Sequence, residues 1–459
     1  MQFHSVNRNS TFFQNDFIEA YYSDKLADFS SYKPNLSELS SAIENRLGFE
    51  QRRRDILVSE LFHQYNGADI KLNTSPVGAN IEKLKSSKTF TITTGQQIHI
   101  GLGPLYVLYK IVDVLTICRE AKELNPDYNF VPVFWMASED HDLEEIQSVK
   151  LYKNEFLWDT AQFGPVGRMN TKGISELFQT IENQFNLSEN QLDFLVRCKD
   201  FYSNGTVASG FRNLLHSYFG EEGLIILDAD SEQLKLSVAP MLEDELLGKN
   251  GDALKETSKQ LSETGFKPQL VVRDTNVFWI SKEGRSKVKL ESGKILSEEG
   301  SELCAIEDVF KYVQNNAQNI SPNAALRPLY QEMILPNLVY VGGGSEMRYW
   351  HQLKGLFQNY TQPLPLLHLR TSNVVIPEAK LKPLDLNVED LFKSENELMS
   401  LYSHDLADVL SSLEKRKLEA ENALELYEKL FAKNVAGRSI TTRLQKIKQR
   451  IAEVDKYAK

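Results

Sequence analysis

Short apolar runs alternate with helical patterns over most of this 459-residue chain, and no other feature limits its fold as strongly. Apolar runs of this length are typical of strands buried on both faces, and helical patterns between them are typical of the crossovers of a parallel sheet. We therefore predict an α/β fold with a mostly parallel sheet. The predicted strands are Phe90 to Thr94, Phe130 to Met136, Leu224 to Asp228, Leu270 to Val272, Val277 to Ile280, Leu338 to Val341 and Leu364 to His368.

A glycine loop separates the first predicted strand from the helical pattern after it, in TTGQQIHIGLGPLYVLYK. Gly101 and Gly103 permit a positive φ or a close approach of backbone. Such a loop can direct backbone N–H groups and the positive end of a helix at a phosphate or carboxylate, but a GxG pair also serves as a plain tight connection. Gln96 and Gln97 are polar groups that a turn alone does not require, and Lys110 is spaced to reach back toward them. These residues favour a ligand site.

A group of carboxylates around one histidine follows the second predicted strand, in VPVFWMASEDHDLEEI. The carboxyl edge of an open α/β sheet is where ligands bind. The group could hold Mg²⁺ through oxygen ligands, or place an acid and a base for proton transfer. Alternatively, Ser138 caps a helix whose first turn is acidic because the helix dipole favours negative charge there. The residues are Glu139, Asp140, His141, Asp142, Glu144 and Glu145.

A second glycine loop, Gly342 to Gly344, follows the strand predicted at Leu338 to Val341, and Ser345 and Glu346 begin the next helix. Three glycines can form a tight crossover, but two bare loops after two strands would leave a cleft lined by backbone N–H groups. We expect the segments around residues 100, 140 and 343 to meet at one rim of the sheet. Arginines beside predicted strands suit a carboxylate or phosphate there, although surface ion pairs also explain them. These are Arg273, Arg327 and Arg370.

Composition limits the partners. The formal net charge of -11 opposes binding to nucleic acid, which requires a basic surface. No window is long and apolar enough to span a membrane, and the N-terminal residues do not follow the order of a signal peptide, so we expect a cytoplasmic protein. The three cysteines, Cys118, Cys198 and Cys304, are too widely spaced to indicate a disulfide framework or a CxxC site.

Beyond a boundary predicted near residue 385, the sequence has two heptad arms joined by NVAGRS. Gly437 can end the first helix and Ser439 can cap the second, so we predict a coiled-coil hairpin over residues 386–459 that forms a homodimer. Lys417 interrupts the apolar stripe. The stripe consists of Leu406, Leu410, Leu413, Ala420, Leu424, Tyr427 and Phe431, then Ile440, Leu444, Ile447, Ile451 and Val454.

Several long motifs resemble the cysteine-adding enzyme of bacillithiol biosynthesis, the cysteine ligase family. They are TGQQ followed by GPLY, PVFWMASEDHD followed by EEI, and RPLYQEMILP followed by VGGGSEMRYW, within a match from about residue 50 to residue 385. The resemblance implies a Rossmann-like core over residues 1–385, with helical insertions at about 155–220 and 235–330, and a coiled coil used for dimerisation. This chain ends soon after its second heptad arm, whereas family members usually continue with a further segment, so the dimer geometry and the activity follow less directly from the resemblance.

The resemblance also implies a reaction in which the carboxyl group of cysteine is joined to the amine of glucosaminyl-malate. A free carboxylate needs activation before it forms an amide, so ATP is expected to supply an acyl-adenylate or acyl-phosphate, with Mg²⁺ as a candidate ion and no redox cofactor. The family motifs place phosphates or anionic oxygens at Gln96, Gln97, Gly101, Gly103, Tyr106, Gly342, Gly343, Gly344 and Glu346.

The catalytic residues expected from the same resemblance are Glu139, Asp140, His141 and Asp142. They would hold Mg²⁺ or the substrate amine, with His141 accepting a proton from the attacking amine. The two malate carboxylates would be bound by Arg273, Arg327 and Arg370, with Tyr349 beside them.

Two other functions remain open at this point. The tripeptide HIG at residues 99–101 is similar to a signature of class I synthetases, which favours an aminoacyl transferase acting on tRNA, although the acidic charge opposes it. A coiled-coil scaffold that binds a nucleotide without turnover is the second alternative.

Overall fold

The structure is a computed structural model that describes residues 4–8, 11, 15–66, 70, 72–151, 153–376, 387–401, 415–419, 421–422 and 425. Contacts divide the chain into two units, residues 15–374 and residues 1–14 with 375–459. In the second unit, the helix α18 spans Glu395–Leu401. Most of the predicted coiled-coil hairpin, including all of its second arm, lies outside the described residues. It and the homodimer therefore stay predictions.

A five-stranded parallel sheet forms the centre of the larger unit, in the order β12-β11-β1-β2-β5. Five of the seven predicted strands lie in it, which confirms the α/β prediction. The buried run TFTITTG makes β1 the central strand because both of its faces are covered. The strands are β1 (Thr89–Gln97), β2 (Asn129–Ala137), β5 (Ile225–Asp228), β11 (Asn337–Gly342) and β12 (Leu366–Leu369).

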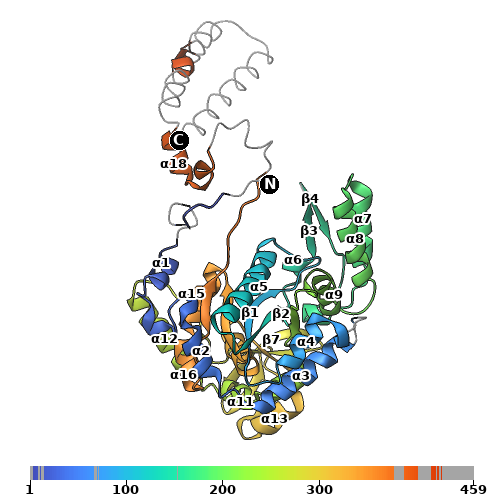
Figure 1. Cartoon of the computed structure of the whole chain (residues 1–459), viewed down its shortest axis with the longest axis vertical. Coiled ribbons are helices and arrows are strands. Elements are labelled where there is room, and N and C mark those ends of the chain that lie inside the picture. The colour runs from blue at the N-terminus through green and yellow to red at the C-terminus, as the bar shows by residue number, and fades with distance from the viewer. Residues whose placement is uncertain are drawn as a thin grey trace. The chain divides into compact units, whose positions relative to one another are not determined.

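Helices cover both faces of this sheet, so its side chains belong to separate cores. On one face, α5 (Tyr106–Leu124) packs over β1 and β2 with α2 (Leu39–Arg46) beside it (Figure 1). On the other face lie α3 (Gln51–Asn66), α4 (Pro76–Lys83), α14 (Arg327–Ile334) and α15 (Gly344–Gln352). The predicted helix after the first glycine loop is therefore confirmed, and it starts at Tyr106.

Residues 277–322 form a second sheet, which corrects one sequence-based expectation. The insertion at about 235–330 was expected to be helical, but it contains a five-stranded antiparallel sheet in the order β10-β6-β7-β8-β9. Valine, tryptophan and isoleucine favour the pleated conformation at β6. Its strands are β6 (Val277–Ser281), β7 (Gly284–Glu291), β8 (Lys294–Ser297), β9 (Glu302–Ala305) and β10 (Ile320–Pro322). The predicted strand at 277–280 thus exists, but not in the parallel sheet.

The strand predicted at Leu270 to Val272 is wrong. The side chain of Gln352 on α15 takes the place of a neighbouring strand, because its Oε1 accepts hydrogen bonds from the N–H groups of Gln269 and Leu270 (3.1 and 2.9 Å). Its Nε2 donates to the carbonyl oxygen of Leu270 (2.9 Å). A side chain that satisfies these backbone groups removes the need for a ladder.

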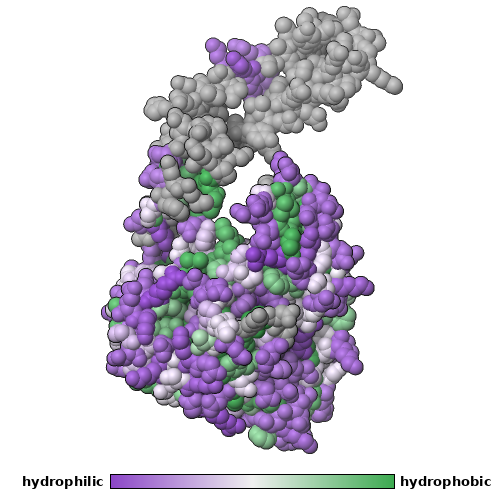
Figure 2. All heavy atoms as spheres, turned by 45° about the vertical axis from the view of Figure 1, so that its right-hand side comes forward, coloured by the Kyte–Doolittle hydropathy of each residue, from purple (hydrophilic) through white to green (hydrophobic). Residues whose placement is uncertain are grey.

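The remaining elements of the larger unit are shorter and mostly helical. A hairpin of β3 (Ser148–Leu151) and β4 (Asn154–Leu157) precedes the helical insertion α7 to α9. The face of the protein that is visible in Figure 2 is mostly hydrophilic, with small apolar patches. Within the described ranges, no helix is long and apolar enough to cross a membrane. The remaining helices are α1 (Asp16–Tyr22), α6 (Leu143–Ile146), α7 (Ile174–Gln184), α8 (Glu189–Phe201), α9 (Val207–Phe219), α10 (Glu232–Leu236), α11 (Ala239–Leu246), α12 (Gly251–Glu263), α13 (Val309–Asn316) and α16 (Lys354–Asn359).

Candidate active site

A cavity of about 400 Å³ opens at the carboxyl edge of the central sheet, between the ends of β1 and β11. After β1 the chain runs to β2 and β5 on one side, and it later returns to β11 and β12 on the other. The helices that follow β1 and β11 pack on opposite faces of the sheet, so their N-termini diverge. This place is the switch point of the sheet, and open α/β sheets bind ligands at their switch points. We call this cavity the cationic hollow, since it is lined by Lys110, Arg327 and Arg370.

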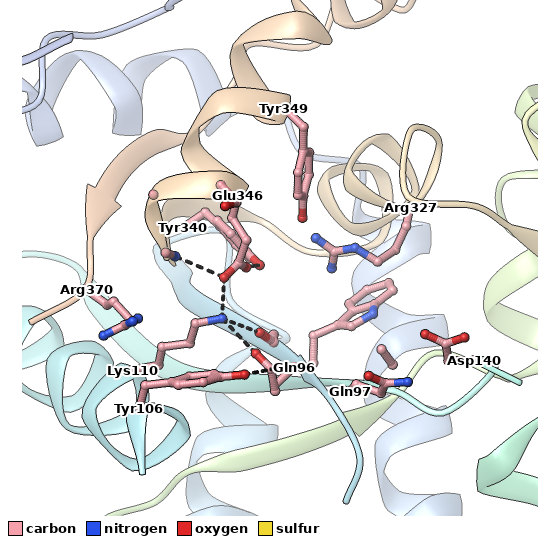
Figure 3. Close-up of a pocket in the computed structure, with 16 residues that line it drawn as sticks. Gln96, Gln97, Tyr106, Lys110, Asp140, Arg327, Tyr340, Glu346, Tyr349 and Arg370 are labelled. Carbon is pink, nitrogen blue, oxygen red and sulfur yellow. Dashed lines mark hydrogen bonds and ion pairs between the residues drawn. The ribbon is translucent and has the colours of Figure 1, made fainter. Parts of the chain in front are cut away.

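Parts of all three sequence motifs meet in the cationic hollow (Figure 3). Gln96 and Gln97 extend from β1, Asp140 follows β2, and the first turn of α15 brings in Gly343 and Glu346. The expectation that these segments share one rim of the sheet is confirmed. The other lining residues are Gly95, Tyr106, Trp135, Ala137, Tyr340, Gly344, Ser345 and Tyr349.

Lys110 is the most deeply buried cation of the hollow, with 1% of its side chain exposed. Its Nζ donates to the carbonyl oxygen of Gly95 (3.0 Å), to Oε1 of Gln96 (3.0 Å) and to Oε1 of Glu346 (2.5 Å). Burial lowers the pKa of Lys110, and the neighbouring Glu346 carboxylate opposes that change. The lysine does reach back to the first loop, as its spacing indicated, and it also reaches the second.

Arg327 lies at the start of α14 with its guanidinium between two aromatic rings, 5.5 Å from that of Trp135 and 5.6 Å from that of Tyr340. Its Nη1 donates to Oε1 of Gln331 (3.0 Å). Its Nη2 is buried and has no hydrogen-bond partner within 3.5 Å among the described residues, and the hydroxyl of Tyr349 interacts with the guanidinium only more weakly. Figure 3 shows the hydroxyl of Tyr349 pointing toward this guanidinium. A buried, incompletely satisfied guanidinium is suited to a carboxylate or phosphate oxygen.

Arg370 approaches the hollow from the end of β12. Its guanidinium lies 5.0 Å from the ring of Tyr106, and its Nη1 donates to the carbonyl oxygen of Thr371 (3.1 Å). Burial raises the pKa of Tyr106, so the phenol stays protonated at neutral pH. Two of the three arginines predicted to bind substrate therefore converge. Arg273 does not, because it lies exposed in the loop after residue 272 and does not line the hollow.

The two glycine loops differ in what they contribute. Gly101 and Gly103 have φ of 79° and 73°, but they do not line the hollow. A Cβ on Gly103 would lie 2.9 Å from the ring of His99, so this glycine is required for a tight turn. Gly101 and Gly103 were predicted to contact a ligand. The structure instead places them in a tight connection outside the hollow, the alternative that the sequence left open.

The second loop does reach the hollow through Gly343 and Gly344, whereas Gly342 ends β11 and is not in the lining. The N–H of Gly343, the N-cap residue of α15, already donates to Oε1 of Glu346 (2.9 Å), which is the half of a capping box that requires no side chain at the N-cap. Glu346 thus holds the loop instead of presenting a free acceptor. The next N–H groups, of Gly344 and Ser345, begin α15 and have no intrahelical partner.

The acidic segment lines a second cavity, of about 610 Å³, which shares Asp140 with the cationic hollow. We call it the acidic hollow. Asp142 caps α6 by accepting a hydrogen bond from the N–H of Glu145 (3.3 Å), so the cap is Asp142 and not Ser138. The lining consists of Asp140, His141, Asp142, Leu143, Glu144, Glu145, Gln147, Gln162 and Phe163.

Glu139 is turned away from both hollows, which corrects its predicted catalytic placement. Its Oε1 accepts a hydrogen bond from Lys235 Nζ (2.6 Å), and the same ammonium contacts Asp230 (3.2 Å). This ion pair, whose lysine is 0% and whose glutamate is 14% exposed, directs the Glu139 side chain toward the interior. In the described part of the chain, no three histidine, cysteine or carboxylate groups lie close enough to hold a metal ion. The acidic segment therefore offers no cluster of its own for Mg²⁺, and an Mg²⁺ ion held together with ATP phosphates stays a prediction.

His141 and Asp140 are held by Arg285 of β7, which the sequence did not single out. Arg285 Nη1 lies 3.3 Å from Nδ1 of His141 and 3.8 Å from Oδ1 of Asp140, and its guanidinium stacks on Phe278 (4.0 Å). Because a guanidinium only donates, Nδ1 of neutral His141 is the acceptor and the ring proton lies on Nε2. His141 can therefore accept a proton only if this contact breaks. No local motif marks Arg285, since it reaches the site from the second sheet.

The parallel sheet, its covering helices and the polar hollow at its switch point define a Rossmann-like protein. A family model described as "Bacillithiol biosynthesis BshC, N-terminal Rossmann-like domain" matches residues 1–371. The chain belongs to this family, the BshC family of bacillithiol biosynthesis.

Curated relatives agree with this assignment. A protein of Flavobacterium psychrophilum named "Putative cysteine ligase BshC" is 34% identical over 446 residues, which cover 94% of this chain and 83% of the relative. Proteins with the same name are 33% identical in Flavobacterium johnsoniae (94% and 82% covered) and 35% identical in Cytophaga hutchinsonii (80% and 69% covered). The resemblance found in the sequence motifs is confirmed. These names support a ligase, and they support neither transfer to tRNA nor a scaffold without catalysis.

Proposed function

We propose that this protein joins the carboxyl group of cysteine to the amine of glucosaminyl-malate, the last step of bacillithiol synthesis, with ATP activating the carboxyl group. The observation that carries the proposal is the convergence of Arg327 and Arg370 in one hollow at the switch point of the sheet. The name of the relatives supports cysteine as one substrate.

The cationic hollow suits the malate part of the second substrate. Its two carboxylates match two guanidinium groups that approach from different elements, α14 and the end of β12. Arg327 offers the buried Nη2 that lacks a partner, whereas the charge of Lys110 is already balanced by Glu346. The hollow therefore has a surplus of positive charge for an anion.

A phosphate group of ATP would find the same chemistry at the first turn of α15. The N–H groups of Gly344 and Ser345 are the groups that would hold it, because a helix N-terminus attracts anions. ATP supplies the free energy that amide formation from a free carboxylate lacks. No step is assigned to a metal ion, since the acidic residues do not form a cluster that fits one.

The acidic hollow suits the amine that attacks. Asp140 lies on the wall shared by both hollows, where it can hold an ammonium group and accept a proton as the amine becomes a nucleophile. His141 adjoins it from the acidic side, and because its Nε2 carries the ring proton, it would donate a hydrogen bond to an acceptor group of the substrate beside that amine. In this arrangement the malate carboxylates lie in the cationic hollow and the amine lies in the acidic hollow, with the carboxylate of Asp140 between them.

The experiment is a reaction of the full chain with ATP, cysteine and glucosaminyl-malate, followed by mass spectrometry. We expect a thiol product whose mass equals the sum of the two substrates less one water, and no product when ATP or cysteine is omitted. Nucleotide analysis of the same mixture distinguishes release of AMP from release of ADP. Absence of product from folded protein with all three substrates would contradict the proposal.

A further inference from the structure

The ammonium group of Lys110 connects elements that are far apart in the sequence. Its three N–H bonds can serve three acceptors, and all three are taken: the Gly95 carbonyl, the Gln96 amide oxygen and the Glu346 carboxylate. Lys110 lies on α5, which packs on one face of the sheet, and Glu346 lies on α15, which packs on the other. The lysine therefore has no donor left for a ligand, although it lines the hollow (Figure 3).

The carboxylate of Glu346 likewise accepts hydrogen bonds from several donors. Beside Lys110, its carboxylate accepts a hydrogen bond from the N–H of Gly343 (2.9 Å) and one from the hydroxyl of Tyr340 (2.6 Å). Its side chain is 22% exposed and faces the hollow that also contains Arg327 and Arg370. An unpaired carboxylate at this position would repel an anionic ligand and would compete with it for the arginines.

We propose that Lys110 is a positioning residue for anion binding: it neutralises Glu346 and fixes the end of β1, and it does not itself bind the ligand. The identity of the anion, glucosaminyl-malate, rests on the proposed function. The role of Lys110 rests only on the contacts across the switch point. Burial of Lys110 lowers its pKa, and the carboxylate of Glu346 opposes that change.

The test uses Lys110→Met, Glu346→Gln and the double variant, with isothermal titration of glucosaminyl-malate into the full chain. Lys110→Met leaves the carboxylate unpaired, so we expect the Kd to rise by about tenfold or more. The double variant removes that carboxylate as well, and we expect it to bind at least about threefold more tightly than Lys110→Met. Steady-state kinetics should give a higher KM for glucosaminyl-malate and a nearly unchanged KM for cysteine.

A matched control lies on the same helix. Lys122 is exposed and donates to the carbonyl oxygens of Pro126 and Tyr128 (2.8 and 2.9 Å), so Lys122→Met should leave the Kd unchanged. A purely structural role for Lys110 predicts that the double variant binds no better than Lys110→Met, and that result would overturn the proposal. If Lys110→Met does not fold, Lys110→Gln, which retains a donor but not the charge, replaces it.

Hydrogen exchange of the protein without ligand separates this inference from the proposed function. We expect Lys110→Met to accelerate exchange both in the peptide that contains residues 95–97 and in the peptide that contains residues 342–346, because it removes the link between them. If the wild type does not bind glucosaminyl-malate, the proposed function fails, and the exchange result still decides the role of Lys110. Unchanged exchange in both peptides would contradict that role.

Discussion

The cationic and acidic hollows share Asp140 but are built differently. In the cationic hollow, Lys110, Glu346 and Arg327 are held by strands, helix starts and other side chains, and Lys110 is 1% exposed. In the acidic hollow the charged groups lie on a short loop, where the side chains of Asp140 and His141 are 38% and 45% exposed. The difference teaches that charged side chains at the carboxyl edge of a sheet are buried where strands and helix starts surround them, and stay exposed where a loop carries them.

The fixed positions of the cationic hollow depend on a buried network beneath it. Gln331, which holds Arg327, donates to Oε1 of Glu332 (2.9 Å), and Asn337 donates to the same oxygen (2.8 Å). The other oxygen of Glu332 pairs with Arg46 (2.6 Å). The acidic hollow has less support among the contacts of its described residues, where Arg285 of β7 contacts Asp140 and His141 from one side. Four predictions test this contrast, from the largest expected effect to the smallest.

Replacing Glu332 tests the support directly. Glu332→Gln keeps the shape but leaves the guanidinium of Arg46 buried without its counter-ion, so the free energy of unfolding should fall by about 3–5 kcal/mol. Urea denaturation followed by tryptophan fluorescence measures it. Glu144→Gln in the acidic hollow is the control, with an expected change below about 0.5 kcal/mol. Equal effects of the two substitutions would remove the contrast.

Acid should destabilise the protein through α15, the helix whose first turn lines the cationic hollow. His351 on α15 is buried against Phe17 and Tyr21, and desolvation lowers its pKa to about 4. In the unfolded chain this histidine has its ordinary pKa of about 6.5. The stability that the buried neutral ring contributes to the folded state is therefore fully present above about pH 6.5 and is lost as the pH falls toward 4. The loss should reach about 3 kcal/mol.

The control for this pH dependence is His351→Gln, which lacks the titrating group. We expect its free energy of unfolding to depend less on pH between about 6.5 and 4 than that of the wild type. Parallel pH profiles for the two proteins would show that another group is responsible.

Arg327 should matter more for activity than any residue of the acidic hollow. Arg327→Met removes the guanidinium that has a free Nη2, so kcat/KM for glucosaminyl-malate should fall by about 100-fold. Arg273→Met, at an exposed arginine outside the hollow, is the matched control and should change kcat/KM less than about twofold. A similar fall in both variants would argue against selective binding by the cationic hollow.

Asp140 tests the wall between the hollows. Asp140→Asn keeps the size of the side chain but removes the base, and we expect kcat to fall by about tenfold with a small change of KM. Glu144→Gln, in the acidic hollow only, should leave kcat within about twofold of the wild type. Steady-state rates of product formation check both. A larger effect at Glu144 would place the reacting amine deeper in the acidic hollow.

The sequence predicts the parallel sheet well because its strands are apolar runs separated by strong helical patterns. It also places Gln96, Asp140 and Gly343 at one edge, since the carboxyl ends of parallel strands share an edge. It fails at Leu270 to Val272, where a distant glutamine side chain satisfies the backbone. No local pattern encodes that contact.

The candidate site is predicted less completely, for the same reason. Gly101 and Gly103 match a ligand loop by residue type, but both adopt a positive φ in a turn, and Gly103 packs against His99. Glu139 is acidic like its neighbours, yet its side chain forms an ion pair with buried Lys235 and does not line either hollow. Arg285 approaches from another sheet, so only the tertiary structure reveals it. Residue type predicts which chemistry is present, and tertiary packing decides which groups face the ligand.

The most direct test of the account is a crystal structure of the full chain with glucosaminyl-malate bound. The account predicts malate carboxylate oxygens within hydrogen-bonding distance of the guanidinium groups of Arg327 and Arg370, with the amine on the side of Asp140. Ligand density outside the cationic hollow, with both arginines unchanged, would contradict it.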